Sequence, residues 1–145
     1  MQEVQFGDQV VRFDRHRTRT AYSAIPMGDP ERCGCSYCIN FAAQRPSAYP
    51  ADFRSLLEQI GIDPEKEGEV YEAGREGDLR TYGGWFYFAG EVVKRGEHTL
   101  TEASGFQYWF VDAKRLPKTV VDFGESVAAV EFVTRLPWLP AGPPD

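Results

Sequence analysis

Three cysteines within six residues are the part of this sequence best suited to chemistry. Cys33, Cys35 and Cys38 form a C-x-C-x2-C pattern, and the chain contains no other cysteine. Extended backbone places side chains two residues apart on one face, and a turn into a helix would bring Cys38 back toward that face. Thiolates bind zinc at about 2.3 Å, usually with four ligands in all. The spacing therefore predicts a zinc site that lacks one ligand.

The fourth ligand is left open by the sequence. His16, His98, a carboxylate or a water molecule could each supply it. A protein ligand would close the site and make it structural, whereas water would leave the open position that catalytic zinc sites keep.

Other interpretations of the cysteines compete with zinc. Cys35 and Cys38 form a C-x-x-C at an expected helix start, where the helix dipole would lower a thiol pKa as in redox motifs. All three could instead be reduced thiols that pack as small apolar residues. Iron–sulfur ligation would usually need a fourth cysteine. Because the odd, clustered count does not suit a disulfide scaffold, we expect a cytoplasmic protein.

The cysteine motif resembles that of the glutathione-dependent formaldehyde-activating family. In that family three cysteines of a C-x-C-x2-C hold a catalytic zinc on an all-β fold. The resemblance implies that Cys33, Cys35 and Cys38 are ligands of an open zinc site that acts on a thiol adduct. It covers about six residues of this chain, which lacks the cysteines of that family's second, structural zinc.

A longer resemblance is to small uncharacterised bacterial proteins that combine three motifs. The motifs are CxCxxCxNF at 33–41, GGWFYFAG at 83–90 and a late strand that ends in Pro137-Trp138. This resemblance implies an α+β domain and carries no activity with it.

Composition and charge exclude several classes of function. The 145 residues carry 22 acidic and 16 basic side chains, a balance that disfavours nucleic-acid binding. No apolar run approaches the roughly 20 residues of a membrane span. The one basic cluster, Arg12 to Arg19, is expected on a solvated strand face. We expect one domain over 1–137 and a Pro-rich, extended tail over 138–145.

Periodicity predicts an α+β fold built on a mostly antiparallel sheet. Residues 9–22 alternate like a strand, and 25–31 resemble a loop. Two short helices are expected between 36 and 60, one with Ser36 as its N-cap and ending before Pro46, the other beginning at Pro50 and capped by Gly61. Further strands are expected at 69–72, 79–93, 106–111 and 127–135. Of these, 106–111 has the composition of a central strand, and Gly83-Gly84 suggests a bulge that turns Trp85.

Aromatic residues gather in the later strands. They are Tyr82, Trp85, Tyr87, Tyr108 and Trp109. Such a set can form ordinary core, or it can line a surface for a protein partner or a small apolar ligand. No constellation of serine, histidine and aspartate is evident. The sequence therefore favours a zinc-binding interaction module over an enzyme. The alternatives are a zinc enzyme that acts on a thiol adduct and a redox protein that uses Cys35 and Cys38.

Overall fold

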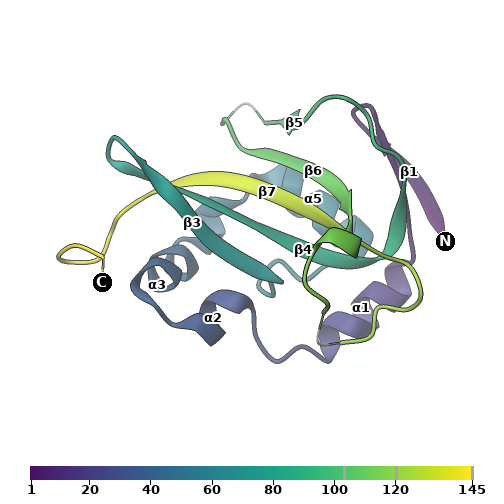
Figure 1. The fold of residues 1–145 in the computed structure, drawn as a ribbon, viewed down its shortest axis with the longest axis horizontal. Coiled ribbons are helices and arrows are strands. Elements are labelled where there is room, and N and C mark those ends of the chain that lie inside the picture. The colour runs from purple at the N-terminus through teal and green to yellow at the C-terminus, as the bar shows by residue number, and fades with distance from the viewer. Residues whose placement is uncertain (103, 120, 145) are drawn as a thin grey trace.

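A single seven-stranded antiparallel sheet organises the computed structural model (Figure 1). The structure describes residues 1–102, 104–119 and 121–144. The strand order is β1-β2-β4-β7-β6-β5, with β3 paired to the first half of β4. The strands are β1 (Gln2–Phe6), β2 (Gln9–Phe13), β3 (Glu69–Glu76), β4 (Leu79–Lys94), β5 (Leu100–Thr101), β6 (Gln107–Asp112) and β7 (Val127–Pro137). The predicted α+β class is confirmed.

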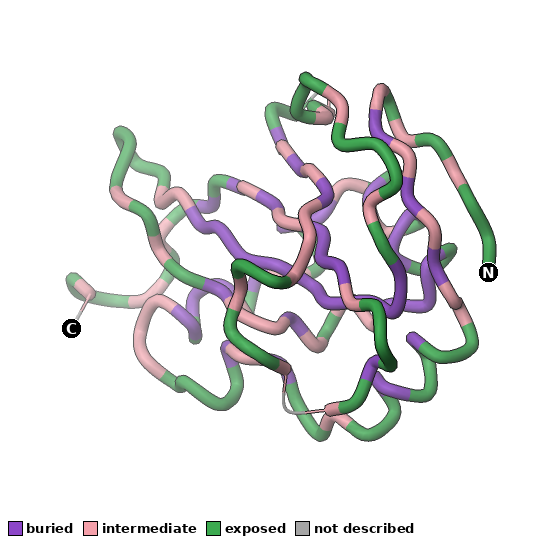
Figure 2. The backbone as a smooth tube through the Cα atoms, turned by 45° about the vertical axis from the view of Figure 1, so that its right-hand side comes forward, coloured by how far each residue is buried: buried purple, intermediate pink, exposed green. Residues whose placement is uncertain are grey.

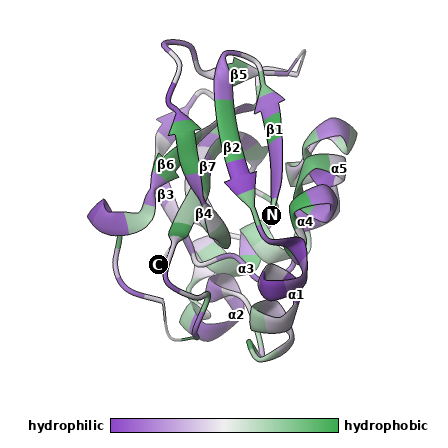
Figure 3. Ribbon diagram, turned by 90° about the vertical axis from the view of Figure 1, so that its right-hand side faces the viewer, coloured by the Kyte–Doolittle hydropathy of each residue, from purple (hydrophilic) through white to green (hydrophobic). Residues whose placement is uncertain are grey.

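The helices of the described residues precede most of the sheet in sequence. They are α1 (Arg15–Ser23), α2 (Asp29–Cys33), α3 (Ser36–Ala43), α4 (Arg45–Ala48) and α5 (Ala51–Ile60), with a short 3-10 turn, η1 (Ala113–Arg115), after β6. Figure 3 shows α4 and α5 on one side of the sheet. Among these helices, none combines the length and apolar character that crossing a membrane requires.

The core lies between the sheet and α3 to α5. Phe53, Leu56, Leu57 and Ile60 of α5 are all buried, as the helical spacing predicted, and Gly61 caps the helix with φ of 97°. Their partners are aromatic, and the Tyr49 ring alone lies within 6.2 Å of five other rings. Figure 2 shows the buried backbone concentrated in the middle of the molecule. Large rings bury much apolar area, so this contact stabilises the pairing of helix and sheet.

The prediction of a strand through residue 22 is wrong beyond Phe13, because α1 begins at Arg15. The Asp14 side chain caps this helix by accepting a hydrogen bond from the Arg17 N–H at 2.9 Å. Thr18, Ala21 and Tyr22 are buried at the i, i+3, i+4 spacing of a helix. The arginines after residue 14 therefore project from a helix, where Arg17 pairs with Asp122 at 2.9 Å, and form no strand face.

Three further local predictions are corrected. The predicted loop at 25–31 ends in α2, whose first turn holds Pro30. The strand β6 lies beside the two-residue edge strand β5, and the central strand is β4, which is buried without interruption from Tyr82 to Gly90. Gly83 pairs regularly with both neighbours, so there is no bulge there. Its missing Cβ makes room for the Tyr71 ring, which would lie 2.5 Å from it.

Candidate metal centre

The cysteines meet at the junction of two helices. Cys33 is the last residue of α2, and Gly34 follows it in the left-handed conformation with φ of 67°, its N–H donating to the Pro30 carbonyl at 3.0 Å. Cys35 is the N-cap of α3, a role that the sequence had suggested for Ser36, and Cys38 lies in the first turn. The cysteines thus converge through a helix, a glycine turn and a second helix, and not through the extended backbone that we expected.

The three sulfur atoms all lie within 4.8 Å of one another. Sulfurs that share a tetrahedral zinc are about 3.8 Å apart, given zinc–sulfur bonds of about 2.3 Å. Cys33 is exposed, Cys35 is half-buried and Cys38 is buried. The cluster could therefore hold a metal ion at the surface, with one side toward solvent.

Neither histidine joins this cluster. His16 is exposed on α1, and His98 lies in the β4–β5 loop with its Nδ1 atom 3.0 Å from the Asp8 carboxylate. Over residues 1–102, 104–119 and 121–144, no histidine, aspartate or glutamate lies with the three sulfurs inside that 4.8 Å distance. Within this part of the chain, the group that could hold a metal ion consists of the three cysteines.

The local electrostatics separate the thiols. Burial raises the pKa of the Cys35 thiol, but the hydrogen bond from the Cys38 N–H to Cys35 Sγ, 3.5 Å long, and contacts with the two other thiols outweigh it, so that this pKa is lowered. Burial, followed by the neighbouring sulfurs, raises the pKa of Cys38. The pKa of the Cys35 thiol therefore lies below that of the Cys38 thiol.

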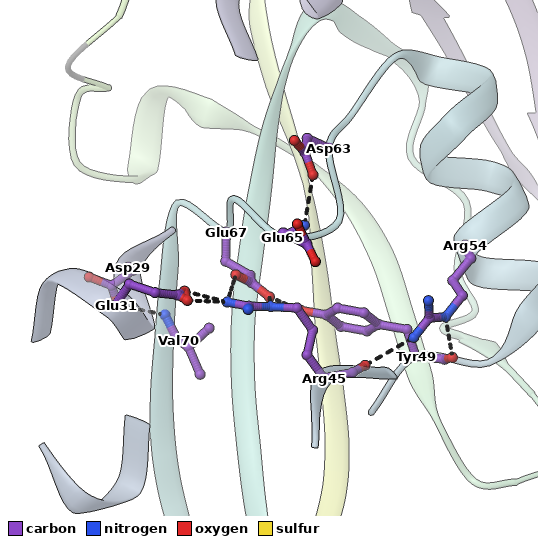
Figure 4. Close-up of polar contacts among 9 residues, drawn as sticks. All are labelled: Asp29, Glu31, Arg45, Tyr49, Arg54, Asp63, Glu65, Glu67 and Val70. Carbon is purple, nitrogen blue, oxygen red and sulfur yellow. Dashed lines mark hydrogen bonds and ion pairs between the residues drawn. The ribbon is translucent and has the colours of Figure 1, made fainter. Parts of the chain in front are cut away.

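A buried ion pair and its neighbours link α2, whose last residue is Cys33, to α4 (Figure 4). The Glu67 side chain is fully buried, and Arg45 donates to both of its oxygens at 2.9 and 3.0 Å. Arg45 also bonds Glu31 of α2 at 2.6 Å, and the Tyr49 hydroxyl donates to Glu67 at 2.6 Å. These contacts join α2 to α4, with the cysteine-bearing α3 between them in sequence.

The start of α2 is fixed to the sheet as well. The Asp29 N–H donates to the Glu67 carbonyl at 3.1 Å, and the Asp29 carboxylate accepts from the Val70 N–H at 2.9 Å. Because α2 has only five residues, its last residue, Cys33, is held by the contacts of its first turn.

The end of the sheet fixes α3. Asn40 of α3 is buried and donates to the Tyr82 hydroxyl at 3.0 Å and to the Pro137 carbonyl at 3.1 Å, while Tyr82 donates to the Tyr37 carbonyl at 3.0 Å. Trp138 packs against the Tyr37 ring at 5.5 Å. Residues of all three motifs in the longer resemblance, or directly beside them, therefore meet at α3.

The aromatic set divides between the two faces of the sheet. Tyr82 and Tyr108 point toward α3 and α5, where both contact core rings. Trp85, Tyr87 and Trp109 alternate onto the other face, where Trp109 donates to Glu131. Four of the five are thus buried, Tyr82 and Tyr108 in the helix-covered layer and Trp85 and Tyr87 on the other face, while Trp109 is half-buried.

The sequence alone did not predict the residues whose contacts hold α2 and α3 in place. Arg45, Glu67 and Asn40 are far apart in sequence, and no local pattern distinguishes a buried polar residue from an exposed one. The signal available for Asn40 was its place in the CxCxxCxNF motif.

The fold and the cluster define an α+β protein with three convergent thiols. Comparison with protein-family models, with curated proteins and with solved structures finds no match to this chain. Both family resemblances therefore stay predictions.

Proposed function

We propose that this protein is a zinc-binding interaction module in which Cys33, Cys35 and Cys38 are the metal ligands. The observation that carries the proposal is the convergence of the three sulfurs within 4.8 Å. Soft thiolate ligands favour zinc over magnesium and calcium, which prefer oxygen. The cytoplasm keeps thiols reduced and is the compartment that suits such a site.

The positioning contacts support a metal site more than incidental packing. Three thiols used only as apolar filling would all be buried, but Cys33 is exposed. Separate networks through Arg45 and Asn40 hold α2 and α3, so the cysteines have little freedom to move apart. Preorganised ligands lose less conformational entropy when an ion binds.

The test is competition for zinc with a chromogenic chelator. We expect one zinc per chain for the wild type and a loss of at least about 10-fold in affinity for each of Cys33→Ser, Cys35→Ser and Cys38→Ser. Ser23→Ala, a matched hydroxyl change on α1, should bind like the wild type. Equal binding by the wild type and all three serine variants would overturn the assignment.

An open zinc enzyme is the second candidate, and the absence of a fourth ligand among the described residues favours it. Water would occupy the free position, and a bound zinc lowers the pKa of such a water to about 7. Turnover of a glutathione–formaldehyde adduct by the zinc-loaded protein, lost in Cys33→Ser, would favour this candidate over the module.

A redox role makes a different prediction for the same residues. It would require a disulfide between Cys35 and Cys38 after mild oxidation, reversed by a dithiol and preserved in Cys33→Ser. Mass spectrometry of trapped thiols distinguishes this outcome from metal binding, which needs all three sulfurs.

A further inference from the structure

One face of the sheet has no helix over β6 and β7. In Figure 1, α5 lies behind these strands and no helix crosses in front of them. Residues paired across antiparallel strands point to the same face, and the register aligns Trp85, Glu131 and Trp109 in one row across β4, β7 and β6. Tyr71 of β3 lies on the same face, paired with Gly83. Two indoles therefore flank the Glu131 carboxylate, and the Tyr71 ring lies 6.3 Å from the nearer one.

Tyr71 presents its ring to solvent on this face. A Cβ at Gly83 would lie 2.5 Å from Tyr71 Cζ, so the glycine lets the ring lean across β4 toward β7. Tyr71 remains 45% exposed. Burial, followed by the nearby charges of Glu131 and Glu69, raises the pKa of its hydroxyl. An accessible ring beside a carboxylate favours a cation, because the ring face and the carboxylate are both negative.

Glu131 keeps one carboxylate oxygen free. Its Oε2 accepts a hydrogen bond from the Trp109 indole N–H, whereas Oε1 has neither a hydrogen bond nor an ion pair within residues 1–102, 104–119 and 121–144. Both side chains are half-buried. A cation at Oε1 would therefore be partly removed from water, where its attraction to the rings is stronger.

The surrounding charges leave Glu131 uncompensated. On this face of the described strands β3, β6 and β7, and of the part of β4 between them, the basic side chain is Arg135, which pairs with Glu76 at 3.0 Å. A cavity along the edge of β6, which Glu131 also lines, has two basic and two further acidic side chains that balance: Arg95, Arg115, Glu97 and Asp112. Its histidine, His98, is bonded to the Asp8 carboxylate. The face is thus negative where the rings gather.

We infer that this face binds a lysine side chain in an extended segment of a protein partner. Tyr71 and Trp109 are three strands apart, about 14 Å, so a peptide can contact both rings but a small ion cannot. With one oxygen free, Glu131 suits the single positive charge of an ammonium group better than the two-pronged fork of arginine. The lysine stem packs on the rings, and its ammonium donates to Glu131 Oε1. This surface goes beyond the proposed metal site and does not depend on it.

NMR of the indole N–H groups, with and without zinc, tests the inference. The probes are short blocked peptides that alternate alanine with lysine, arginine, norleucine or glutamate. We expect the lysine peptide to shift the Trp109 resonance to saturation at about millimolar concentration, equally with and without zinc. The arginine peptide should bind no more tightly, and the other two should leave the resonance unchanged. Trp138, which donates to the Gly142 carbonyl, is the internal control.

The failures of this surface and of the metal site are separately visible, because the titration needs no metal. An unmoved Trp109 resonance in the presence of the lysine peptide, or an equal shift with the norleucine peptide, would overturn the inference. Tighter binding of the arginine peptide would overturn the choice of lysine.

Variants test the assigned contacts in the same titration. Glu131→Gln keeps an acceptor for the Trp109 indole and removes the charge, so affinity for the lysine peptide should fall by about 2- to 5-fold. Tyr71→Leu removes the exposed ring and should weaken binding by a similar factor. Glu125→Gln, an exposed change in the loop before β7, is the control and should bind like the wild type. Equal losses in Glu125→Gln and Glu131→Gln would reveal a general effect of net charge and contradict the assigned site.

Discussion

The exposed Cys33 distinguishes the functional interpretations at the scale of single residues. Cys38 is buried and contributes packing whether or not a metal is present, but Cys33 faces solvent and makes little contact of that kind. Its sulfur lies within 4.8 Å of the sulfurs of Cys35 and Cys38, so metal binding is the role that its position supports. Substitution of Cys33 therefore separates ligation from packing.

Cys33→Ser should lower the melting temperature only when zinc is present. Zinc at about a thousand times its Kd would stabilise the wild type by about 4 kcal/mol, on the order of 10 °C for a chain of this size. In chelator the two proteins should melt together, whereas Cys38→Ser should remain destabilised because its site is buried. Differential scanning calorimetry with and without zinc measures this, and a Cys33→Ser protein that gains as much from zinc as the wild type contradicts ligation.

Asp8 gives a prediction about pH. The Glu97 N–H, followed by the side chain of His98, lowers the pKa of the Asp8 carboxyl. A carboxyl with a lowered folded-state pKa contributes stability above its unfolded value, near 3.8, and loses that contribution as the pH falls through its folded value.

Asp8→Asn should therefore be less stable than the wild type at neutral pH, and the difference should shrink below pH 3.8. Urea unfolding at several pH values measures it. Asp78→Asn, an exposed change in the β3–β4 turn, is the control and should show no such trend. A difference between Asp8→Asn and the wild type that is constant across pH would rule out the titration of Asp8 as its source.

At the scale of elements, two short helices carry the cysteines, and long-range contacts hold both of them. Helices of five and eight residues are marginal in isolation, so their geometry comes from tertiary contacts. The Arg45 and Glu67 pair supplies one such contact, and the hydrogen bonds of Asn40 supply the other. Breaking either should disturb the distances between the sulfurs.

Arg45→Met should destabilise the fold by about 3–5 kcal/mol, because it leaves the buried Glu67 carboxylate uncompensated. Adding Glu67→Gln removes that charge while keeping an acceptor for the Tyr49 hydroxyl, and we expect it to recover at least half of the loss. Arg32→Met, an exposed change on α2, is the control. Chemical denaturation measures all four proteins, and a double variant less stable than Arg45→Met would contradict the role of the buried charge.

The sequence predicts those elements whose signals come from neighbouring residues, and it fails for those that depend on contacts with distant residues. The helix α5 was predicted to within a residue at each end because its apolar spacing, Pro50 and Gly61 are all local signals. The helix α1 was not predicted because its alternating arginine and threonine residues have the period of a strand. The signal for its start is the Asp14 N-cap, which is a single side chain. The sequence predicted that the cysteines converge, but it did not predict the backbone conformation that brings them together. That conformation includes a left-handed turn at Gly34, which forms because the preceding residues are the helix α2.

At the scale of the whole molecule, the sheet has one face covered by helices and a second face with different cover. The layer of α3 to α5 covers one face and holds the core, and the α2–α3 junction carries the cysteines. The other face carries Trp85, Tyr87 and Trp109.

Elemental analysis shows whether the three cysteines hold zinc. The protein should be purified without added metal or a metal-binding tag, and its free thiols counted before and after denaturation in chelator. We expect close to one zinc per chain, with thiols that are protected until the metal is removed. Protein without metal whose three thiols titrate freely in the native state would contradict it.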